Sequence, residues 1–449
     1  MTLLGPRLVV AGTHSGVGKT TIASGLMAAF ARRGLRVAPA KVGPDFIDPG
    51  YHSLAAGRPG RNLDAWMSGP ENIAPLAGRA AIGSDVLVVE GVMGMFDGAD
   101  DRTVSSSADV AVLLGAPVVL VVDAGGMSQS IAAVVHGFST LDPRVQVAGV
   151  VCNRVGSPRH VALLRNALEP LGFPVLGALA VDDAFSWRDR HLGLVPVIEQ
   201  PDTVRAALDH LAQAIERDCD LDMILRLARS AVQINVTDVA VPEPVGRARV
   251  ALAAGRAFSF MYEDNLEALR AAGAELVPFD PCVDASLPER CAGLVAGGGF
   301  PEVYGEALAA NTSLLVDVRR AAADGMAVWA ECGGLLWLAE RLDGRPMAAV
   351  VPTEAAMTGR LTLGYRHVRT AAGSPLGPAG TELRGHEFHY SRVAPGGEGL
   401  VPVAPGAVAP AAWVGPARFA SYLHCHLGAS PEVAAAFVRA TASGERRAN

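Results

Sequence analysis

The sequence predicts an α/β protein with two doubly wound domains. Short runs of β-branched and apolar residues alternate with amphipathic segments in both halves of the chain, a pattern typical of parallel βαβ units. One glycine-containing turn follows such a run at residues 12–20, and another follows a second run at residues 330–334. Later segments rich in Gly, Thr, Tyr and Val predict antiparallel strands added to the second domain.

The first domain is expected over residues 1–235, as a parallel sheet that carries the first glycine turn. Residues 118–122 are apolar throughout, which suits a sheet buried on both faces. Amphipathic patterns predict helices at residues 20–33, 128–139 and 159–171. The strands expected here are residues 7–11, 35–40, 86–89, 118–122 and 147–151.

A stretch with two prolines and no periodicity, residues 236–246, is interpreted as the interdomain linker. A second βα alternation then predicts a domain over residues 247–442. The polar end of the chain, residues 443–449, is expected to fray. The parallel strands expected in the second domain are residues 249–254, 275–279, 293–296 and 327–330, and the antiparallel segments are residues 357–370, 381–393 and 411–423.

The composition is that of an ordinary globular protein. Of the 449 residues, 50% are hydrophobic and 18% are charged. The longest apolar run, residues 110–122, is too short to span a membrane and is broken by Gly115, Ala116 and Pro117. It predicts a helix end, a turn and a buried strand. No secretory signal is visible. We expect no membrane partner.

The cysteines and the net charge narrow the setting further. The six cysteines form no CxxC pair, which disfavours zinc-binding and thioredoxin-like chemistry. Such cysteine usage fits a reduced, cytoplasmic location. A formal net charge of −7 argues against nonspecific binding to nucleic acid. An anionic small substrate remains compatible with this charge, because local arginines can dominate a pocket.

The first glycine turn has the features of a phosphate-binding loop. Backbone N–H groups of such a loop and the following helix N-terminus converge on one anion. Lys19 is expected to reach the terminal phosphates, and the hydroxyl of Thr20 to bind Mg²⁺. The strict GxxxxGK[ST] pattern would need Gly at position 13, where this chain has Thr, and a purely structural glycine turn is the alternative. The residues predicted to bind ATP are Thr13, Ser15, Gly16, Val17, Gly18, Lys19, Thr20 and Thr21.

Acidic segments leave two neighbouring predicted strands, at residues 41–49 and 88–98. Open α/β sheets bind ligands at the carboxyl ends of their strands, so these side chains are expected to share one site. The residues predicted to form this site are Lys41, Asp45, Asp48, Glu90 and Asp97. Carboxylate and hydroxyl oxygens suit Mg²⁺, with Thr20, Asp45 and Glu90 as its expected ligands. The alternative is that the aspartates only form turns beside Pro and Gly.

The second glycine turn places Cys332 between a strand and a helix. A sharp strand-to-helix turn exposes a nucleophile at a helix N-terminus, a position that lowers the pKa of a thiol below its usual value of about 8.5. We therefore interpret Cys332 as a catalytic nucleophile. The alternative is a small buried hydrophobic residue, which is our interpretation of the other five cysteines.

A nucleophilic cysteine needs a base and an oxyanion hole. His424 and His426 follow the predicted strand 418–423 on one face, so they could supply the base and a group that orients it. A pair of structural histidines or a metal site is the alternative. Backbone amides of Gly298, Gly299 and Gly333 are the predicted oxyanion hole, against the alternative of a structural loop.

On these residues the two halves resemble two known kinds of domain. The first loop resembles that of dethiobiotin-synthetase-like ATPases, and the AECGG turn with a distal histidine resembles class I (triad) glutamine amidotransferase domains. The combination, in this order, resembles the cobyrinic and hydrogenobyrinic acid a,c-diamide synthases of cobalamin biosynthesis. The strings that carry the resemblance span nearly the whole chain: KVGPDFIDPGYH (41–52), VVEGVMGMFDG (88–98), RHLGLV (190–195), GGGFPE (297–302), AECGGLLWL (330–338), GHEFHYS (385–391) and SYLHCH (421–426).

The resemblance implies a mechanism. Glutamine is hydrolysed at Cys332 with His424 as base, and ammonia passes internally to the ATP site. There ATP converts the a and c acetate carboxylates of the corrin to acyl phosphates, which become amides. Two positions depart from the general amidotransferase pattern: Ala330 stands where many such turns carry Gly, and His426 stands where a Glu usually follows the triad histidine. The third member of the triad is therefore open.

A substrate with many carboxylates calls for cationic or hydrogen-bonding groups. The candidates lie between the two glutaminase residues, in the expected antiparallel segments. Arginine suits planar carboxylates because it pairs with both oxygens. Solvated strand faces are the alternative. The corrin-binding candidates are Arg366, Arg384, His386 and His389.

Three other functions compete with this interpretation. Cobyric acid synthase uses the same two modules on other corrin carboxylates, and a nickel-tetrapyrrole a,c-diamide synthase is a related enzyme. The third is a nucleotide-dependent switch with an inactive amidotransferase module, which the presence of Cys332 and His424 disfavours. The expected partners are a corrin, glutamine and ATP, with Mg²⁺ as cofactor. A homodimer is the assembly that we consider, although the sequence does not determine the oligomeric state.

Overall fold

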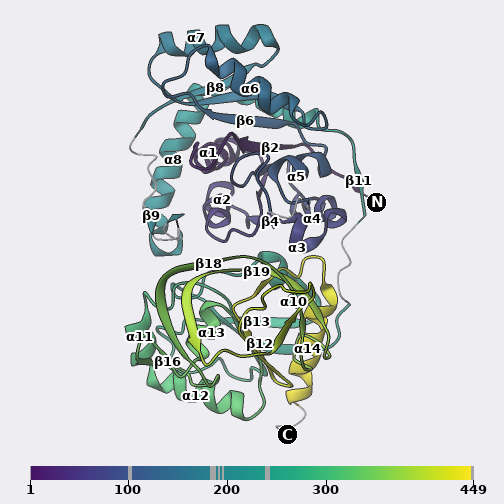
Figure 1. Cartoon of the computed structure of the whole chain (residues 1–449), viewed down its shortest axis with the longest axis vertical. Helices are drawn as coiled ribbons and strands as arrows, with labels where there is room; N and C mark the ends of the chain where they lie inside the picture. Colours follow the sequence, from purple (N-terminus) through teal and green to yellow (C-terminus); the bar gives the residue numbers. More distant parts are fainter. Residues whose placement is uncertain are drawn as a thin grey trace. The chain divides into compact units, whose positions relative to one another are not determined.

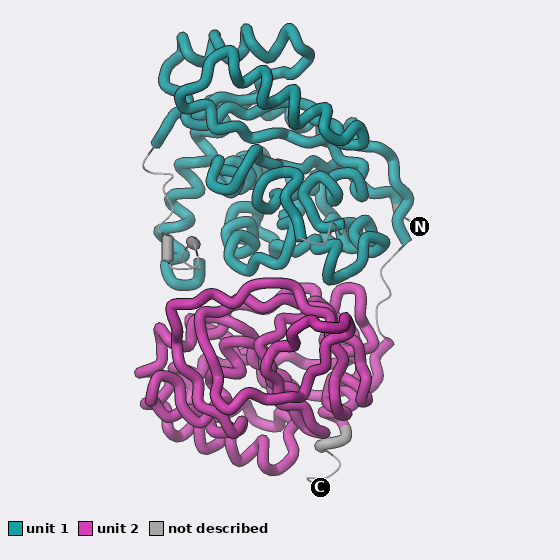
Figure 2. The backbone as a smooth tube through the Cα atoms, in the orientation of Figure 1, with its two compact units in different colours: residues 1–239 teal, residues 240–449 magenta. Residues whose placement is uncertain are grey.

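The computed structural model describes residues 2–99, 104–182, 189–190, 193–194, 197–237 and 243–445. The chain divides into two compact units, Met1–Val239 and Ala240–Asn449, drawn in different colours in Figure 2. Part of the expected linker (238–242), part of the string 190–195 and the last four residues of the expected tail (446–449) lie outside the described residues. Figure 1 labels the elements of each unit.

The first unit is built on a seven-stranded sheet whose strands are all parallel, in the order β4-β3-β5-β2-β6-β7-β8. The sheet has the continuous burial that its apolar strands predict, since residues 118–122 are at most 1% exposed. The strands are β2 (Arg7–Gly12), β3 (Val37–Val42), β4 (Arg61–Leu63), β5 (Val86–Glu90), β6 (Val118–Asp123), β7 (Val147–Val155) and β8 (Val175–Ala180). Short pairs add β1 (Thr2–Leu3) to β11 (Asn235–Val236) and β9 (Asp189–Arg190) to β10 (Gly193–Leu194).

Helices cover both faces of this sheet, as a doubly wound fold requires (Figure 1). One hydrophobic core joins the sheet to α1, α2, α8 and α9, and a second core joins it to α4, α5, α6 and α7. The helices are α1 (Lys19–Arg32), α2 (Asp48–Ala56), α3 (Ala65–Ser68), α4 (Ile73–Ala80), α5 (Ser107–Leu113), α6 (Ser130–Thr140), α7 (Pro158–Leu168), α8 (Pro201–Asp218) and α9 (Leu221–Arg229), with 3₁₀ turns at Pro70–Asn72, Glu169–Leu171 and Val197–Glu199.

One strand begins two residues later than its sequence predicts. The expected strand 35–40 is β3, Val37–Val42, because the end of α1 uses the preceding residues. Gly34 has a φ of +81°, and the N–H of Leu35 donates to the carbonyl of Phe30 across the helix end. This closing turn of the helix takes up residues that the apolar pattern alone assigns to the strand.

The second unit contains a six-stranded sheet in the order β13-β12-β14-β15-β22-β21. Its first five strands are parallel and β21 is antiparallel to β22. The helices α11, α12 and α13 belong to the core on one side, and α10 and α14 to the core on the other. These elements are β12 (Ala248–Ala253), α10 (Glu263–Ala271), β13 (Ala274–Phe279), β14 (Gly293–Ala296), α11 (Gly305–Ala310), α12 (Thr312–Ala323), β15 (Ala327–Glu331), α13 (Gly333–Leu338), β21 (Ala412–Gly415), β22 (Arg418–Ser421) and α14 (Pro431–Glu445).

A second, mixed sheet of this unit has the order β17-β16-β18-β19-β23, with β20 paired to β18. Long antiparallel strands β18 and β19 form its centre, as expected for residues 357–370 and 381–393. Its strands are β16 (Arg341–Leu342), β17 (Arg345–Pro346), β18 (Glu354–Thr370), β19 (Glu382–Ala394), β20 (Leu400–Pro402) and β23 (His424–Cys425).

The segment 411–423 corrects the sequence prediction. It is not one antiparallel strand but a hairpin of β21 and β22, and β22 lies parallel to β15 in the first sheet. Strand β22 of the first sheet ends at Ser421, and the chain then pairs His424 and Cys425 with β19 of the second sheet. Periodicity cannot reveal this change of sheet, because both sheets bury the same kind of side chain.

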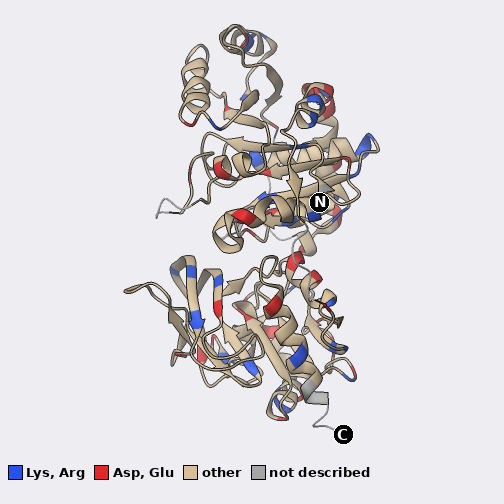
Figure 3. Ribbon diagram, turned by 90° about the vertical axis from the view of Figure 1, so that its right-hand side faces the viewer, with Lys and Arg blue, Asp and Glu red and all other residues tan. Residues whose placement is uncertain are grey.

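Acidic and basic residues are interspersed over the elements of both units (Figure 3). Neither sign is confined to one element. Within the described residues, no helix is both long and apolar enough to cross a membrane.

Candidate active sites

The loop between β2 and α1 has the backbone that a phosphate-binding turn needs. Gly16 and Gly18 have φ values of +81° and +98°, which only glycine adopts without strain. A Cβ on Gly18 would collide with the amide of Asn153, and a Cβ on Gly12 would lie 2.8 Å from Cγ of Lys19. The glycines of this loop are thus required by close approach as well as by conformation.

Lys19 and Thr20 lie at the first turn of α1. The ammonium of Lys19 donates to the carbonyl of His14 at 3.1 Å, and the side chain is only 6% exposed. Burial, followed by the charge of Lys41, lowers the pKa of Lys19 to about 8. The hydroxyl of Thr20 donates to Oε1 of Glu90 at 2.7 Å and lies 3.5 Å from Oδ2 of Asp48.

A buried ionic network lies beside this loop, at the carboxyl ends of β3 and β5. Lys41 and Glu90 are register partners in the sheet, and Nζ of Lys41 lies 2.9 Å from Oε1 of Glu90 and 2.7 Å from Oδ2 of Asp48. Burial would lower the pKa of Lys41, but Asp48 and Glu90 hold it above its ordinary value. Burial would likewise raise the pKa of Glu90, but Lys41 and then His52 hold it below the ordinary value.

Asp45 and Asp97 complete the predicted group. Burial, and then the neighbouring charge of Asp48, raises the pKa of Asp45 well above its ordinary value. The N–H of Ile47 donates to Asp45 at 2.7 Å. Asp97 accepts from the N–H of Gly94 at 2.9 Å, and its charge acts on Lys19. The structure therefore brings the acidic residues, Lys41 and the loop together.

The remaining predicted loop residues take different positions. Thr13 pairs its hydroxyl with Nδ1 of His14 at 3.1 Å, and Ser15 is exposed. Val17 is fully buried, whereas Thr21 is half-buried in α1. The exposed hydroxyl of Ser15 and the backbone of the loop are thus the groups open to a ligand.

Three residues of this site were missed from the sequence. His52 is fully buried and its Nε2 lies 2.6 Å from Oε2 of Glu90. Asn153 and Arg154, at the end of β7, donate to the carbonyls of Val17 and Gly16 at 2.8 and 3.0 Å. The string 41–52 contains His52, but only the fold reveals that β7 ends against the phosphate-binding loop.

In the second unit, Cys332 occupies a strained strand-to-helix turn. Its φ of +46° and ψ of −98° are unusual for a residue with a side chain, and such strain is typical of nucleophile turns. The following glycines allow this turn to pack closely. A Cβ on Gly334 would collide with the carbonyl of Ala296, and one on Gly333 would lie 3.0 Å from the nitrogen of Gly299.

The pKa of the Cys332 thiol differs from the sequence prediction. Burial raises its pKa well above the ordinary value, and the charge of Glu302 raises it further. The N–H of Gly333 opposes this shift but does not outweigh it. The expected lowering by the helix N-terminus fails because α13 is only six residues long and the thiol is buried. The resting thiol is therefore protonated.

The predicted oxyanion hole is also revised. The N–H of Gly298 donates to the carbonyl of Phe260 at 2.9 Å, in an isolated bridge between the two residues, so it is already committed. Gly299 and Gly333 lie beside each other next to the sulfur-bearing turn. The amides of Gly299 and Gly333 are therefore the candidate oxyanion donors, and Gly298 has another role.

That role is close packing against His424. A Cβ on Gly298 would lie 2.5 Å from Cε1 and 3.4 Å from Nε2 of His424. The imidazole thus directs its Nε2 edge towards the loop that packs against Gly333. Its other nitrogen, Nδ1, lies 3.5 Å from Oε2 of Glu331. Both side chains of this last pair are buried.

His426 lies in a different environment. Its Nε2 is 3.5 Å from Oδ2 of Asp264, and its ring centroid is 4.9 Å from that of Tyr262. The two histidines therefore face different carboxylates rather than each other. This arrangement gives no support to His426 as the group that orients His424.

Three of the corrin-binding candidates contact either His424 or Glu387. His386 stacks on His424, with ring centroids 5.0 Å apart. Nε of Arg366 donates to Glu387 at 2.6 Å, and Nε2 of His389 lies 3.3 Å from the same carboxylate. The charge of Glu387 contributes to the raised pKa of Cys332. Arg384, the fourth candidate, is exposed on β19.

The ring of His389 also stacks on Tyr422, with centroids 3.7 Å apart and planes inclined by 7°.

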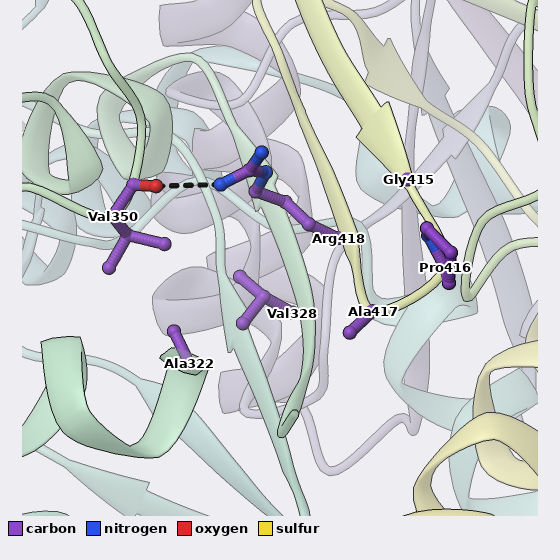
Figure 4. Close-up of a pocket in the computed structure, with 7 residues that line it drawn as sticks. All are labelled: Ala322, Val328, Val350, Gly415, Pro416, Ala417 and Arg418. Atoms are coloured by element: carbon purple, nitrogen blue, oxygen red, sulfur yellow. Dashed lines mark hydrogen bonds between the residues drawn. The ribbon is translucent and has the colours of Figure 1, made fainter. Parts of the chain in front are cut away.

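A separate cavity of about 220 Å³ lies among Val328, Val350 and Arg418 (Figure 4). The cavity lies near the amino ends of β15 and β22, whereas Cys332 follows the carboxyl end of β15. Arg418 donates to the carbonyl of Val350 there, at 2.6 Å.

The fold and these two sites define a class of protein: a nucleotide-binding domain joined to a glutamine amidotransferase domain. Residues 8–194 match the CobQ/CobB/MinD/ParA nucleotide-binding domain, and residues 249–432 match the CobB/CobQ-like glutamine amidotransferase domain. These matches confirm the predicted fold class of both halves.

Relatives similar over nearly the full length identify the family. The chain is 48% identical to hydrogenobyrinate a,c-diamide synthase of Streptomyces coelicolor, over 96% of this chain and 97% of the relative. It is 44% identical to the protein of the same name from Thermobifida fusca, over 98% and 97%. It is 43% identical to cobyrinate a,c-diamide synthase of Syntrophotalea carbinolica, over 96% and 98%. The chain belongs to the family of the hydrogenobyrinate and cobyrinate a,c-diamide synthases.

Proposed function

We propose that this protein uses ATP and glutamine to amidate the a and c acetate side chains of hydrogenobyrinic or cobyrinic acid in cobalamin biosynthesis. The observation that carries the proposal is the presence of two sites in one chain. One is the turn of Cys332 with His424, and the other is the loop of Lys19 beside the Lys41–Glu90 network. Membership of the family gives the substrate and the two positions on it.

The glutaminase half releases ammonia by covalent catalysis. His424 takes the proton from the thiol of Cys332, and the sulfur forms a bond to the side-chain amide carbon of glutamine. The oxyanion that forms is stabilised by the N–H groups of Gly299 and Gly333. His424 then returns its proton to the amide nitrogen as the carbon–nitrogen bond breaks, which yields ammonia and a thioester. Water attacks the thioester, which gives glutamate and restores the thiol.

The synthetase half makes a carboxylate reactive. An oxygen of the substrate carboxylate attacks the terminal phosphorus of ATP, the bond from that phosphorus to the bridging oxygen breaks, and ADP leaves. Ammonia then attacks the acyl phosphate, inorganic phosphate leaves, and the nitrogen loses a proton to give the amide. Lys19 and the amides of its loop bind the phosphates and compensate the charge that develops on them. Lys41 neutralises charge between Asp48 and Glu90.

Magnesium fits the donors of this site. Mg²⁺ prefers oxygen ligands, and Thr20, Asp45 and Glu90 offer them. Oε1 of Glu90 contacts Thr20 and Lys41, and Oε2 contacts His52. Among the described residues, no cluster of three His, Cys, Asp or Glu side chains forms a ready metal site. Phosphate oxygens of a bound nucleotide would supply the remaining ligands, as is usual for Mg²⁺. The ion would neutralise charge on those phosphates.

Ammonia must remain unprotonated between the two reactions. It is mostly protonated in water at neutral pH, so local release and a dry route to the acyl phosphate favour the neutral nucleophile. We include this internal transfer in the proposal. Homodimerisation and a cytoplasmic location stay predictions, and sedimentation and fractionation measurements test them.

The experiment counts amides. The purified protein is incubated with ATP, Mg²⁺ and glutamine, together with either metal-free or cobalt-containing corrin, and the products are weighed by mass spectrometry. We expect two amides per molecule from one or both corrins. The variants Lys19→Ala and Glu90→Gln are expected to lose synthesis with glutamine and with ammonium alike, because both routes need the acyl phosphate. Amidation at other carboxylates would indicate a cobyric acid synthase, and nucleotide hydrolysis without any glutaminase activity would indicate a switch.

A further inference from the structure

The proposed reaction gives no role to Glu331, the residue directly before the nucleophile. Glu331 ends β15 and its side chain is 1% exposed. Oε1 accepts hydrogen bonds from Nε1 of Trp329 at 3.1 Å and from the N–H of Cys425 at 3.0 Å. The second donor belongs to the residue that follows His424. Two fixed donors therefore hold the carboxylate beside the histidine.

The other carboxylate oxygen is directed at the base. Oε2 of Glu331 lies 3.5 Å from Nδ1 of His424, and it makes no hydrogen bond to any residue that the structure describes. A buried carboxylate oxygen is costly unless a donor satisfies it. Catalytic hydrogen bonds are often long before substrate binds and shorten in the reacting complex. The facing Nδ1–H of His424 is the donor that suits this oxygen.

The other buried carboxylates nearby are engaged elsewhere. Asp264 faces His426 at 3.5 Å. Glu387 is bonded to Arg366 at 2.6 Å and lies 3.3 Å from His389. The opposite edge of the His424 ring, with Nε2, faces the loop at Gly298 that packs against the nucleophile turn. The Nδ1 side of the imidazole thus faces Glu331, and its Nε2 side faces the loop beside the nucleophile turn.

We propose that Glu331 is the third member of the glutaminase triad, as a positioning residue for His424. Its carboxylate accepts a hydrogen bond from Nδ1–H, which leaves Nε2 without a proton and able to take one from Cys332. It also compensates the positive charge that His424 gains. This proposal rests on the proposed glutaminase function. The orienting carboxylate then belongs to the residue directly before Cys332, at the end of β15, rather than to the segment after His424.

The test is Glu331→Gln. The amide keeps the size and an oxygen for Trp329 and Cys425, but it presents an N–H to Nδ1, which favours the wrong tautomer. We expect the glutaminase kcat to fall by roughly 10²–10⁴-fold, as for triad carboxamide variants and acid–base partners, with the KM for glutamine nearly unchanged. Alkylation of Cys332 by iodoacetamide is expected to slow in parallel. Glu331→Asp, which keeps the charge, is expected to recover part of kcat.

Asp264→Asn is the matched control, because it also removes the charge of a buried carboxylate that faces a histidine. We expect its glutaminase kcat to fall by less than about tenfold. Ammonium-dependent corrin amidation by Glu331→Gln is expected to match wild type, which shows that the chain is folded. If that variant does not fold, Trp329→Phe removes a donor to Oε1, and a severalfold loss of kcat at constant KM is expected instead.

The outcomes separate this proposal from the function on which it rests. An active wild type with an unimpaired kcat in Glu331→Gln, or in Trp329→Phe where that variant replaces it, overturns the role of Glu331 and leaves the glutaminase intact. A rise in KM without loss of kcat also overturns it, since positioning of the base acts on the chemical step. A wild-type protein without any glutaminase activity overturns the proposed function itself.

Discussion

His386 stacks on His424, with ring centroids 5.0 Å apart and ring planes inclined by 21°. The two residues are also register partners in the pairing of β19 with β23. Burial lowers the pKa of His386 well below its ordinary value, and the neighbouring His424 lowers it further. His386 is therefore neutral, so only one positive charge forms when His424 takes the proton of the thiol.

A permanent charge at position 386 is expected to slow glutamine hydrolysis. His386→Arg places a cation near the imidazolium, and two like charges about 5 Å apart repel by about 3 kcal/mol at an effective dielectric constant of about 20. We expect glutaminase kcat to fall by about 100-fold. His386→Phe keeps a stacking ring without charge, and its kcat is expected to stay within about tenfold of wild type. Equal losses in the two variants would show that charge is not the cause.

Cys332→Ser separates the two sources of nitrogen. We expect this variant to lose glutamine-dependent amidation of the corrin, because the hydroxyl lacks the nucleophilicity of a thiol. Amidation with a high concentration of ammonium is expected to continue, since the ATP site does not need the glutaminase. Product mass under both conditions tests this. Loss of both activities would contradict two separate sites.

His424 and His426 are expected to differ strongly. His424→Ala removes the proposed base and is expected to lower glutaminase kcat by roughly 10²–10⁴-fold. His426→Ala is expected to have a smaller effect, because its Nε2 faces Asp264 and its ring lies against Tyr262. Steady-state glutamine hydrolysis measures both. A greater loss in His426→Ala would show that the two roles are reversed.

Nucleotide affinity is expected to depend on pH through Lys19. Its pKa of about 8 in the free protein means that the ammonium loses its proton as pH rises through that value. Bound phosphates favour the charged form, so the Kd for ATP is expected to increase between about pH 7 and 9.5. Calorimetric titration at several pH values tests this. In Lys19→Arg the guanidinium stays charged, so its Kd is expected to remain flat across the range, even where binding is weaker.

Asp45 is expected to cost stability in the protein without nucleotide. Its raised pKa means that the folded state holds the proton more tightly than the unfolded chain, so the free energy of unfolding falls as pH rises above the ordinary Asp value. Asp45→Asn is therefore expected to raise Tm at neutral pH by about 2–4 °C, the shift that about 1 kcal/mol gives a domain of this size. Calorimetry measures the change.

The control residue for Asp45 is Asp85, whose pKa is shifted in the opposite direction. Arg36 lowers the pKa of Asp85 to about 2. Asp85→Asn is therefore expected to bring no rise in Tm. Asp45→Asn is also expected to lose corrin amidation with either nitrogen source, because it removes a proposed Mg²⁺ ligand. A lower Tm for Asp45→Asn would contradict the destabilising role of the buried carboxylate.

The parallel sheets and both glycine turns are predictable from sequence because local signals determine them. Apolar strands such as 293–296 and 118–122 match the observed elements to within a residue. The elbow at Cys332 follows from a strand, small residues and a short apolar helix. The backbone conformation that the glycines permit is a property of a few adjacent residues, so it is readable without the fold.

The rest of the two sites depends on contacts between distant segments. Glu331 has the position of a strand end in the sequence, and only the return of the chain at 424–425 brings a histidine to it. Asn153 contacts the phosphate-binding loop across 136 residues. The commitment of the Gly298 amide to Phe260 is equally invisible in a glycine-rich string. No periodic pattern encodes such pairings.

The protonated state of the resting Cys332 thiol has a consequence for the durability of the enzyme. Peroxides and other oxidants attack thiolates far more readily than thiols, and the first product, a sulfenic acid, leads on to irreversible forms. A buried thiol whose pKa is raised presents little thiolate until His424 takes the proton as the thiol attacks glutamine. The same arrangement that delays catalysis until substrate arrives therefore protects the nucleophile from oxidative loss between turnovers.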